Sequence, residues 1–212
     1  MLKKKVPTEY PSYNAPRGYK NDRDYGLESL IKDPRNIFHG SQTKGLGSLK
    51  LPEGYGSEGG VYLVDKFIDP RLRQYVKGRP SKGAPGSAYV TEPNFKNVLT
   101  VGDTSKEMDR LLKNLEINLS NQIKNPFKFS EPAYQVRQLR KNVVGVPTSF
   151  TKEAGEGLRD MGVDAIRIPN KRRGVDNSDT FISLNPSENL NILDEINLAE
   201  LDELVRRLSG NK

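Results

Sequence analysis

Three short segments of this 212-residue chain contain side chains that could bind a flat ring joined to a sugar. In the first, the only histidine of the chain, His39, follows two apolar residues and precedes Gly40 and Ser41. In the second, Tyr62 lies in an apolar run directly after a glycine pair. An imidazole can hydrogen-bond a sugar hydroxyl, a tyrosine ring can stack on a heterocycle, and backbone beside glycine can pair with an amide. The two segments therefore predict a binding site built from two strand ends.

The third segment runs from residue 162 to residue 168 and resumes at residues 179–186, where Asp179 precedes Thr180. Cleaving a ring from a sugar passes through an oxocarbenium-like transition state, which a nearby carboxylate stabilises. Adjacent residues of a regular strand face opposite ways, unless a bulge re-aims one of them. Asp179 and Thr180 therefore face opposite sides if this segment is a regular strand.

Taken in order, these segments resemble the core of the histidine–tyrosine–glutamate class of ADP-ribosyltransferases. That class includes diphtheria-type toxins and poly-ADP-ribose polymerases, and the similarity is greatest to short phage and bacterial members. It extends from Ile37 to Asp194, with His39-Gly40-Ser41 as the first motif and Tyr62 as the stacking tyrosine. Further matches are Tyr75 in the following helix and residues 97–101, 162–166, 184–186 and 189–193.

The resemblance implies NAD as the substrate and assigns roles to particular side chains. His39 would orient the ribose, Gly40 would hold the carboxamide and Tyr62 would stack on the nicotinamide, with Ser41 and Tyr75 as further contacts. Thr180 stands at the position of the class's glutamate, so Asp179 would have to serve as the replacement catalytic carboxylate beside His39. No metal is expected in such a site.

Two functions follow from the resemblance. One is a mono-ADP-ribosyltransferase that transfers ADP-ribose from NAD to a protein or nucleic acid, with Asp179 as the carboxylate. The other is a catalytically degenerate fold retained as a structural head or tail component of a phage virion, which Thr180 favours. A basic nucleic-acid binder without catalysis is a third alternative, because residues 71–82 include Arg71, Arg73, Lys77, Arg79 and Lys82.

The composition excludes several classes of site. The chain has no cysteine, which rules out disulfides, thiol nucleophiles and zinc–thiolate centres, and one histidine cannot form a multi-histidine metal site. The net charge of +7 favours anionic partners such as an acidic protein surface or nucleic acid. No apolar run reaches membrane-spanning length, and the charged residues 1–5 precede no apolar signal core. We therefore expect a cytoplasmic or virion-associated protein without a membrane partner or a secretory signal.

The pattern of apolar residues predicts an α+β domain with a split, mostly antiparallel sheet and flanking helices, like the ADP-ribosyltransferase fold. Expected strands are residues 37–39, 61–64, 88–91, 97–101, 163–168 and 180–184. Expected helices lie around 27–31 and at 68–76, 104–125, 132–141 and 151–161, with a last helix from residue 197. Capping signals are Asp69 with Pro70, Thr104 with Glu107, Thr151 with Gly162, and Asn197 with Glu200.

We expect three parts along the chain. Residues 1–26 form a basic arm in which prolines separate tyrosines, residues 27–194 form the ADP-ribosyltransferase-like domain, and residues 195–212 form an amphipathic helix. Rings spaced by prolines can lie along a partner groove at low entropic cost. The arm is therefore expected to bind a protein partner, such as a larger virion assembly.

Overall fold

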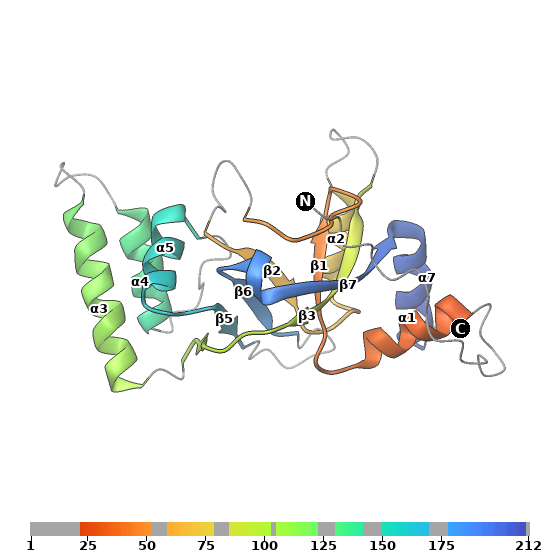
Figure 1. Ribbon diagram of the computed structural model, residues 1–212, viewed down its shortest axis with the longest axis horizontal. Helices are drawn as coiled ribbons and strands as arrows, with labels where there is room; N and C mark the ends of the chain where they lie inside the picture. The colour runs from red at the N-terminus through yellow and green to blue at the C-terminus, as the bar shows by residue number, and fades with distance from the viewer. Residues whose placement is uncertain are drawn as a thin grey trace.

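The computed structural model describes residues 22–51, 59–78, 85–102, 105–122, 130–141, 150–169 and 178–210. It has an α+β architecture with seven strands in one mixed sheet (Figure 1). In these ranges, none of the helices has the length and apolar character needed to span a bilayer.

The sheet has the strand order β4-β5-β6-β2-β1-β3-β7. Strands β4 and β5 are parallel and the other neighbouring pairs are antiparallel, which confirms a mostly antiparallel sheet. The sheet is continuous, but β1 and β2 are joined through a single register pair, Phe38 with Val64. The strands are β1 (Ile37–Ser41), β2 (Val61–Val64), β3 (Ser87–Pro93), β4 (Val98–Thr100), β5 (Ala165–Ile168), β6 (Thr180–Ser183) and β7 (Leu190–Asn197).

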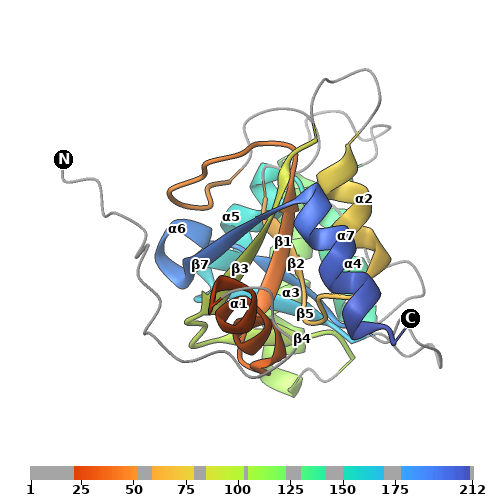
Figure 2. The same ribbon diagram turned by 90° about the vertical axis from the view of Figure 1, so that its right-hand side faces the viewer.

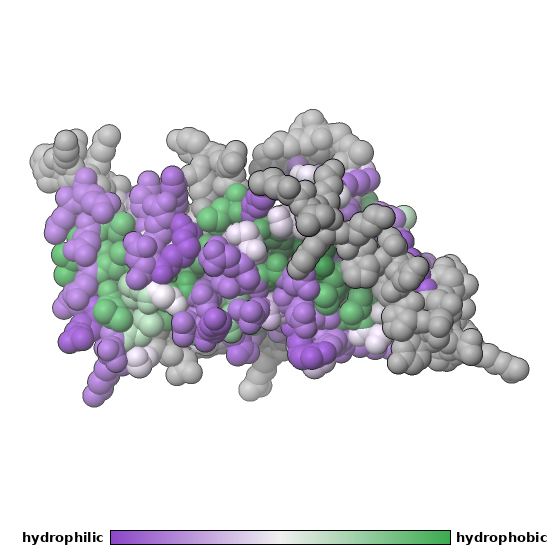
Figure 3. All heavy atoms as spheres, in the orientation of Figure 1, coloured by the Kyte–Doolittle hydropathy of each residue, from purple (hydrophilic) through white to green (hydrophobic). Residues whose placement is uncertain are grey.

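Two groups of helices cover the two ends of this sheet. Figure 1 shows α3, α4 and α5 at one end and α1, α2 and α7 at the other, and Figure 2 shows the second group in front of the strands. Figure 3 shows hydrophilic residues on the outer helices of one face and hydrophobic residues between them. The helices are α1 (Asp22–Lys32), α2 (Pro70–Lys77), α3 (Lys106–Asn121), α4 (Glu131–Lys141), α5 (Lys152–Asp160), α6 (Pro186–Asn189) and α7 (Leu198–Leu208).

Each helical group has its own apolar core. One core joins α3, α4 and α5 to strands β4, β5 and β6, with Leu112, Val136, Leu158 and Ile182 fully buried. The other joins α1, α2 and α7 to β1 and β3. A third apolar cluster packs Ile37 of β1 with Val61 and Leu63 of β2, and both strands carry residues of the candidate site.

Helix ends follow the capping chemistry expected from the sequence. Asp69 caps α2 with Pro70 at the first position, Thr151 caps α5, and Asn197 with Glu200 forms a capping box on α7. The expected cap of α3 was wrong in position, because the Ser105 hydroxyl accepts from the Met108 amide. Ser105 and the expected cap Thr104 both have a side-chain hydroxyl, and Ser105 is one residue closer to the helix.

Both expected part boundaries fall inside secondary-structure elements. Helix α1 starts at Asp22, before residue 27, and its Leu27 lies in the core with α7. Strand β7 continues through residue 195 to Asn197, and Arg23 of α1 donates to the Glu195 carbonyl. The last helix is therefore part of the main core. The rest of the expected arm, residues 1–21, lies outside the described residues.

Candidate functional site

A cavity of about 800 Å³ lies at the ends of β1 and β2, beside α2 and the loop that follows β1. The five side chains and backbone positions expected for ring and ribose binding all line it: His39, Gly40, Ser41, Tyr62 and Tyr75. They come from two strands and a helix, and the narrow joint between β1 and β2 brings them together. Ligand pockets in proteins have volumes of roughly 300–1,000 Å³. This cavity is therefore large enough for a nucleotide.

Gly40 allows helix α2 to approach β1 closely. A Cβ atom at this position would lie 2.8 Å from the Leu72 carbonyl oxygen and 2.8 Å from the Cβ of Tyr75. Both atoms are fixed to the helix backbone, so neither can rotate away. The absence of a side chain at Gly40 therefore sets the distance between the strand and the helix that carries Tyr75.

The His39 ring has a defined tautomer. Its Nδ1 lies 2.7 Å from the carbonyl oxygen of Tyr62, and a carbonyl can only accept, so Nδ1 carries the proton. Burial lowers the pKa of His39, while the Tyr62 carbonyl raises it to a smaller extent, so the ring is neutral at pH 7. Nε2 is then an acceptor, and no described residue donates to it. The ring stacks on Tyr89, with 6.4 Å between centroids.

The two cavity tyrosines differ in exposure. Tyr62 packs against the core that includes Leu158 of α5, and burial raises the pKa of its hydroxyl, while the Phe150 backbone lowers it to a smaller extent. Tyr75 is 50% exposed. Tyr75 therefore has the more accessible ring face for a ligand, whereas the sequence favoured Tyr62 for stacking.

The loop after β1 also lines the cavity, and no motif in the sequence indicated this. The Gly45 amide donates to both carboxylate oxygens of Glu195 at 3.0 Å. The Tyr89 hydroxyl donates to the Thr43 carbonyl at 2.8 Å and accepts from the Leu46 amide at 3.3 Å. These contacts hold a glycine-rich segment in place, and Lys50 at its end adds a positive charge to the cavity lining.

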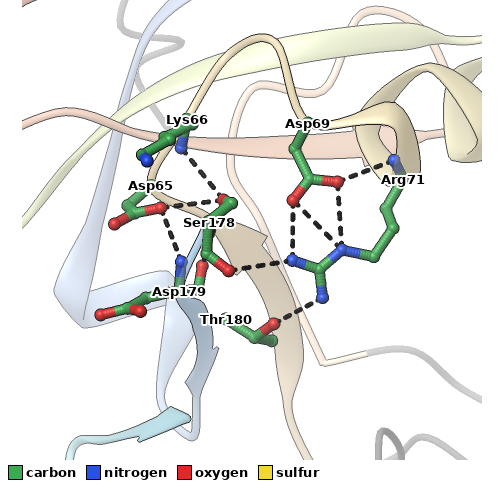
Figure 4. Close-up of polar contacts among 7 residues, drawn as sticks. All are labelled: Asp65, Lys66, Asp69, Arg71, Ser178, Asp179 and Thr180. Carbon is green, nitrogen blue, oxygen red and sulfur yellow. Dashed lines mark hydrogen bonds and ion pairs between the residues drawn. The ribbon is translucent and has the colours of Figure 1, made fainter. Parts of the chain in front are cut away.

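A second, smaller cavity of about 100 Å³ shares Gly40, Tyr62 and Tyr75 with the larger one. Thr180, at the position of the glutamate in the resembling class, lines it together with Arg71. The Arg71 Nη1 donates to the Thr180 hydroxyl at 2.7 Å (Figure 4). A guanidinium, and no carboxylate, therefore contacts Thr180 in this cavity.

Arg71 is fixed by a carboxylate on the other side of its guanidinium. Its Nε and Nη2 donate to the Asp69 carboxylate, and Nη2 also donates to the Ser178 carbonyl at 3.3 Å (Figure 4). Burial alone would raise the pKa of Asp69, but the hydrogen bonds and charge of Arg71 lower it overall. The sequence showed Asp69 as a helix cap, and it could not show that Arg71 reaches Thr180.

Asp179, the expected catalytic carboxylate, lines neither cavity. Its carboxylate pairs with Arg167 of β5 at 2.6 Å, and its amide donates to Asp65 at 2.8 Å. Thr180 faces the small cavity instead, as strand alternation requires for the neighbouring residue. No aspartate or glutamate is among the described residues that line the two cavities.

Metal-binding potential and similarity to known proteins bear on the class of site. Within the described ranges, no group of histidine, aspartate and glutamate side chains is arranged to hold a metal ion. Comparison with models of known protein families, with curated proteins and with solved structures found no match to this chain.

Proposed function

We propose that this protein is a catalytically degenerate member of the ADP-ribosyltransferase-like class that binds an NAD-type dinucleotide without transferring ADP-ribose. The observation that carries the proposal is that His39, Gly40, Ser41, Tyr62 and Tyr75 line one cavity of about 800 Å³. These residues lie up to 36 positions apart in the sequence. A chance resemblance would give no reason for them to line the same cavity.

The cavity offers a partner for each part of such a ligand. The Nε2 atom of the neutral His39 ring can accept a hydrogen bond from a ribose hydroxyl. The exposed Tyr75 ring can stack on a heterocycle. Gly40 lines the cavity, where its backbone would meet a carboxamide, and Lys50 can attract the phosphates.

The charge distribution opposes transfer. The oxocarbenium-like transition state is positive, and the nearest fixed charge at Thr180 is the Arg71 guanidinium. Asp179 is held by Arg167 away from both cavities. An active transferase is the second candidate, supported by the same five residues, and it would need Asp179 to leave its partner.

A role in a larger assembly, such as a phage virion, is proposed from the resemblance to phage members. It would depend on residues 1–21, which lie outside the described residues. A truncation that tests this role should end before Asp22, because α1 carries core residues such as Leu27.

The test of the proposed function separates binding from transfer. Titration calorimetry is expected to detect NAD binding to the wild type, and Tyr75→Ala should weaken it several-fold, equivalent to about 1 kcal/mol for the lost stack. Tyr134→Ala is the matched control, since Tyr134 is 41% exposed and lines neither cavity. The same protein incubated with labelled NAD and lysate should transfer no label. Absence of binding at millimolar NAD would reject the site, and transferred label would identify an enzyme.

A further inference from the structure

A row of three side chains crosses the sheet beside the large cavity. His39 of β1 lies directly opposite Tyr89 of β3, and Tyr89 lies directly opposite Glu195 of β7. Residues that lie opposite each other in neighbouring strands have side chains on the same face of the sheet. His39 lines the cavity, whereas Tyr89 and Glu195 do not. The row therefore joins a residue of the site to two residues outside it.

Tyr89 contacts the lining of the cavity through both its ring and its hydroxyl. The ring stacks on the His39 imidazole, while the hydroxyl donates to the Thr43 carbonyl and accepts from the Leu46 amide. Burial raises the pKa of Tyr89 to about 12, so the hydroxyl keeps its proton at pH 7 and can donate. The side chain is fully buried, and dense packing around it limits the positions that the ring can take.

Glu195 binds the part of the cavity loop that lies between these two hydrogen bonds. The Gly45 amide donates to both oxygens of the Glu195 carboxylate, and Gly45 has a φ of +67°. Few residues other than glycine adopt this conformation readily. Thr43, Gly45 and Leu46 are thus each bound to Tyr89 or Glu195, and all three line the cavity.

On the basis of the proposed function, we infer that Tyr89 and Glu195 are positioning residues that set the affinity of the cavity for the dinucleotide. Tyr89 fixes the His39 ring by stacking and the loop through its hydroxyl, while Glu195 fixes the loop alone. A site whose lining is already ordered avoids the entropic cost of ordering it on binding. Because both residues act on one loop, their contributions to affinity are not independent.

Calorimetric titration of the full chain with NAD separates the two roles of Tyr89. Tyr89→Phe keeps the ring and removes two hydrogen bonds, so binding should weaken at least about threefold. The His39 ring nitrogens should keep their wild-type magnetic resonance signals in this variant. Tyr89→Leu also removes the stack, so the His39 signals should move and binding should weaken further. Tyr134→Phe is the matched control, since Tyr134 lies on α4 and lines neither cavity.

Variants of Glu195 test whether it acts on the same loop as Tyr89. Glu195→Ala removes the acceptor of the Gly45 amide and should also weaken NAD binding, while Glu195→Gln keeps an oxygen acceptor and should weaken it less. The double variant Tyr89→Phe/Glu195→Ala should bind about as weakly as the weaker single variant, because the loop is released only once. Glu188→Ala is the control, since Glu188 is exposed and lines neither cavity.

The outcomes separate the inference from the proposed function. Wild-type affinity in both Tyr89→Phe and Glu195→Ala, or losses that multiply in the double variant, would overturn the positioning roles and leave dinucleotide binding standing. Failure of the wild type to bind NAD would overturn the proposed function and the inference together. The thermal midpoint shows whether each variant is folded, and Tyr89→Phe and Glu195→Ala decide the matter if Tyr89→Leu unfolds.

Discussion

Replacing Gly40 with alanine is expected to lower the free energy of unfolding by about 2 kcal/mol, as overpacking of a close contact does. The added methyl group would lie 2.8 Å from the Leu72 carbonyl oxygen and from the Tyr75 Cβ, so helix α2 must move away from β1. The shift would also carry Tyr75 away from the cavity and weaken dinucleotide binding. Urea denaturation of the variant and the wild type measures the change.

The control for Gly40→Ala is Gly47→Ala in the loop of the same cavity. A Cβ at Gly47 has no atom within 4 Å among the described residues, so this variant should unfold with nearly the wild-type free energy. Equal stability of the Gly40 and Gly47 variants would contradict the close approach of β1 and α2.

The second large effect is expected at Asp69, whose side chain is 2% exposed in its pair with Arg71. Asp69→Ala removes both the N-cap of α2 and the partner of the guanidinium, so a loss of about 2 kcal/mol is expected. Asp69→Asn keeps an oxygen for the cap and should lose about half as much. In contrast, Asp202→Asn, which breaks the more exposed pair with Arg73, should cost at most about 0.5 kcal/mol.

The Asp69 contribution should depend on pH in a defined direction. Its folded-state pKa is lower than that of the unfolded chain, near 3.9, so the pair stabilises the fold above that value. The contribution is lost as the pH falls through the folded-state pKa. Acid denaturation of Asp69→Asn should therefore be less steep than that of the wild type in this range, and identical curves would show that the pair contributes nothing.

Much of the secondary structure could be predicted because local signals agree with the tertiary contacts. The strand expected at residues 61–64 has the same bounds as β2. Helix α2 begins at Pro70 with Asp69 as its N-cap, as the capping signal predicted. Strand β7 was not among the expected strands, because polar residues such as Glu195 interrupt its apolar pattern. Glu195 has a tertiary role there, since its carboxylate accepts from Gly45 in the cavity loop.

The site could be predicted only in part, because its decisive contacts join residues distant in sequence. The resemblance placed Thr180 at the glutamate position, but Arg71 is 109 residues away, and nothing in a basic stretch indicates which arginine turns inward. The cavity loop is rich in glycine and has no periodicity. Its order comes from Glu195 and Tyr89, so the sequence of the loop itself carries no signal for it.

The most direct test of the account is nuclear magnetic resonance of the His39 imidazole, which is the only one in the chain. In the free protein at pH 7, the ring nitrogens should show a protonated Nδ1 and an unprotonated Nε2. Saturation with NAD should shift the Nε2 signal in the direction of an acceptor that has gained a hydrogen bond, and the ring should stay neutral. An unchanged Nε2 signal in the presence of bound dinucleotide would show that the ligand does not occupy this cavity.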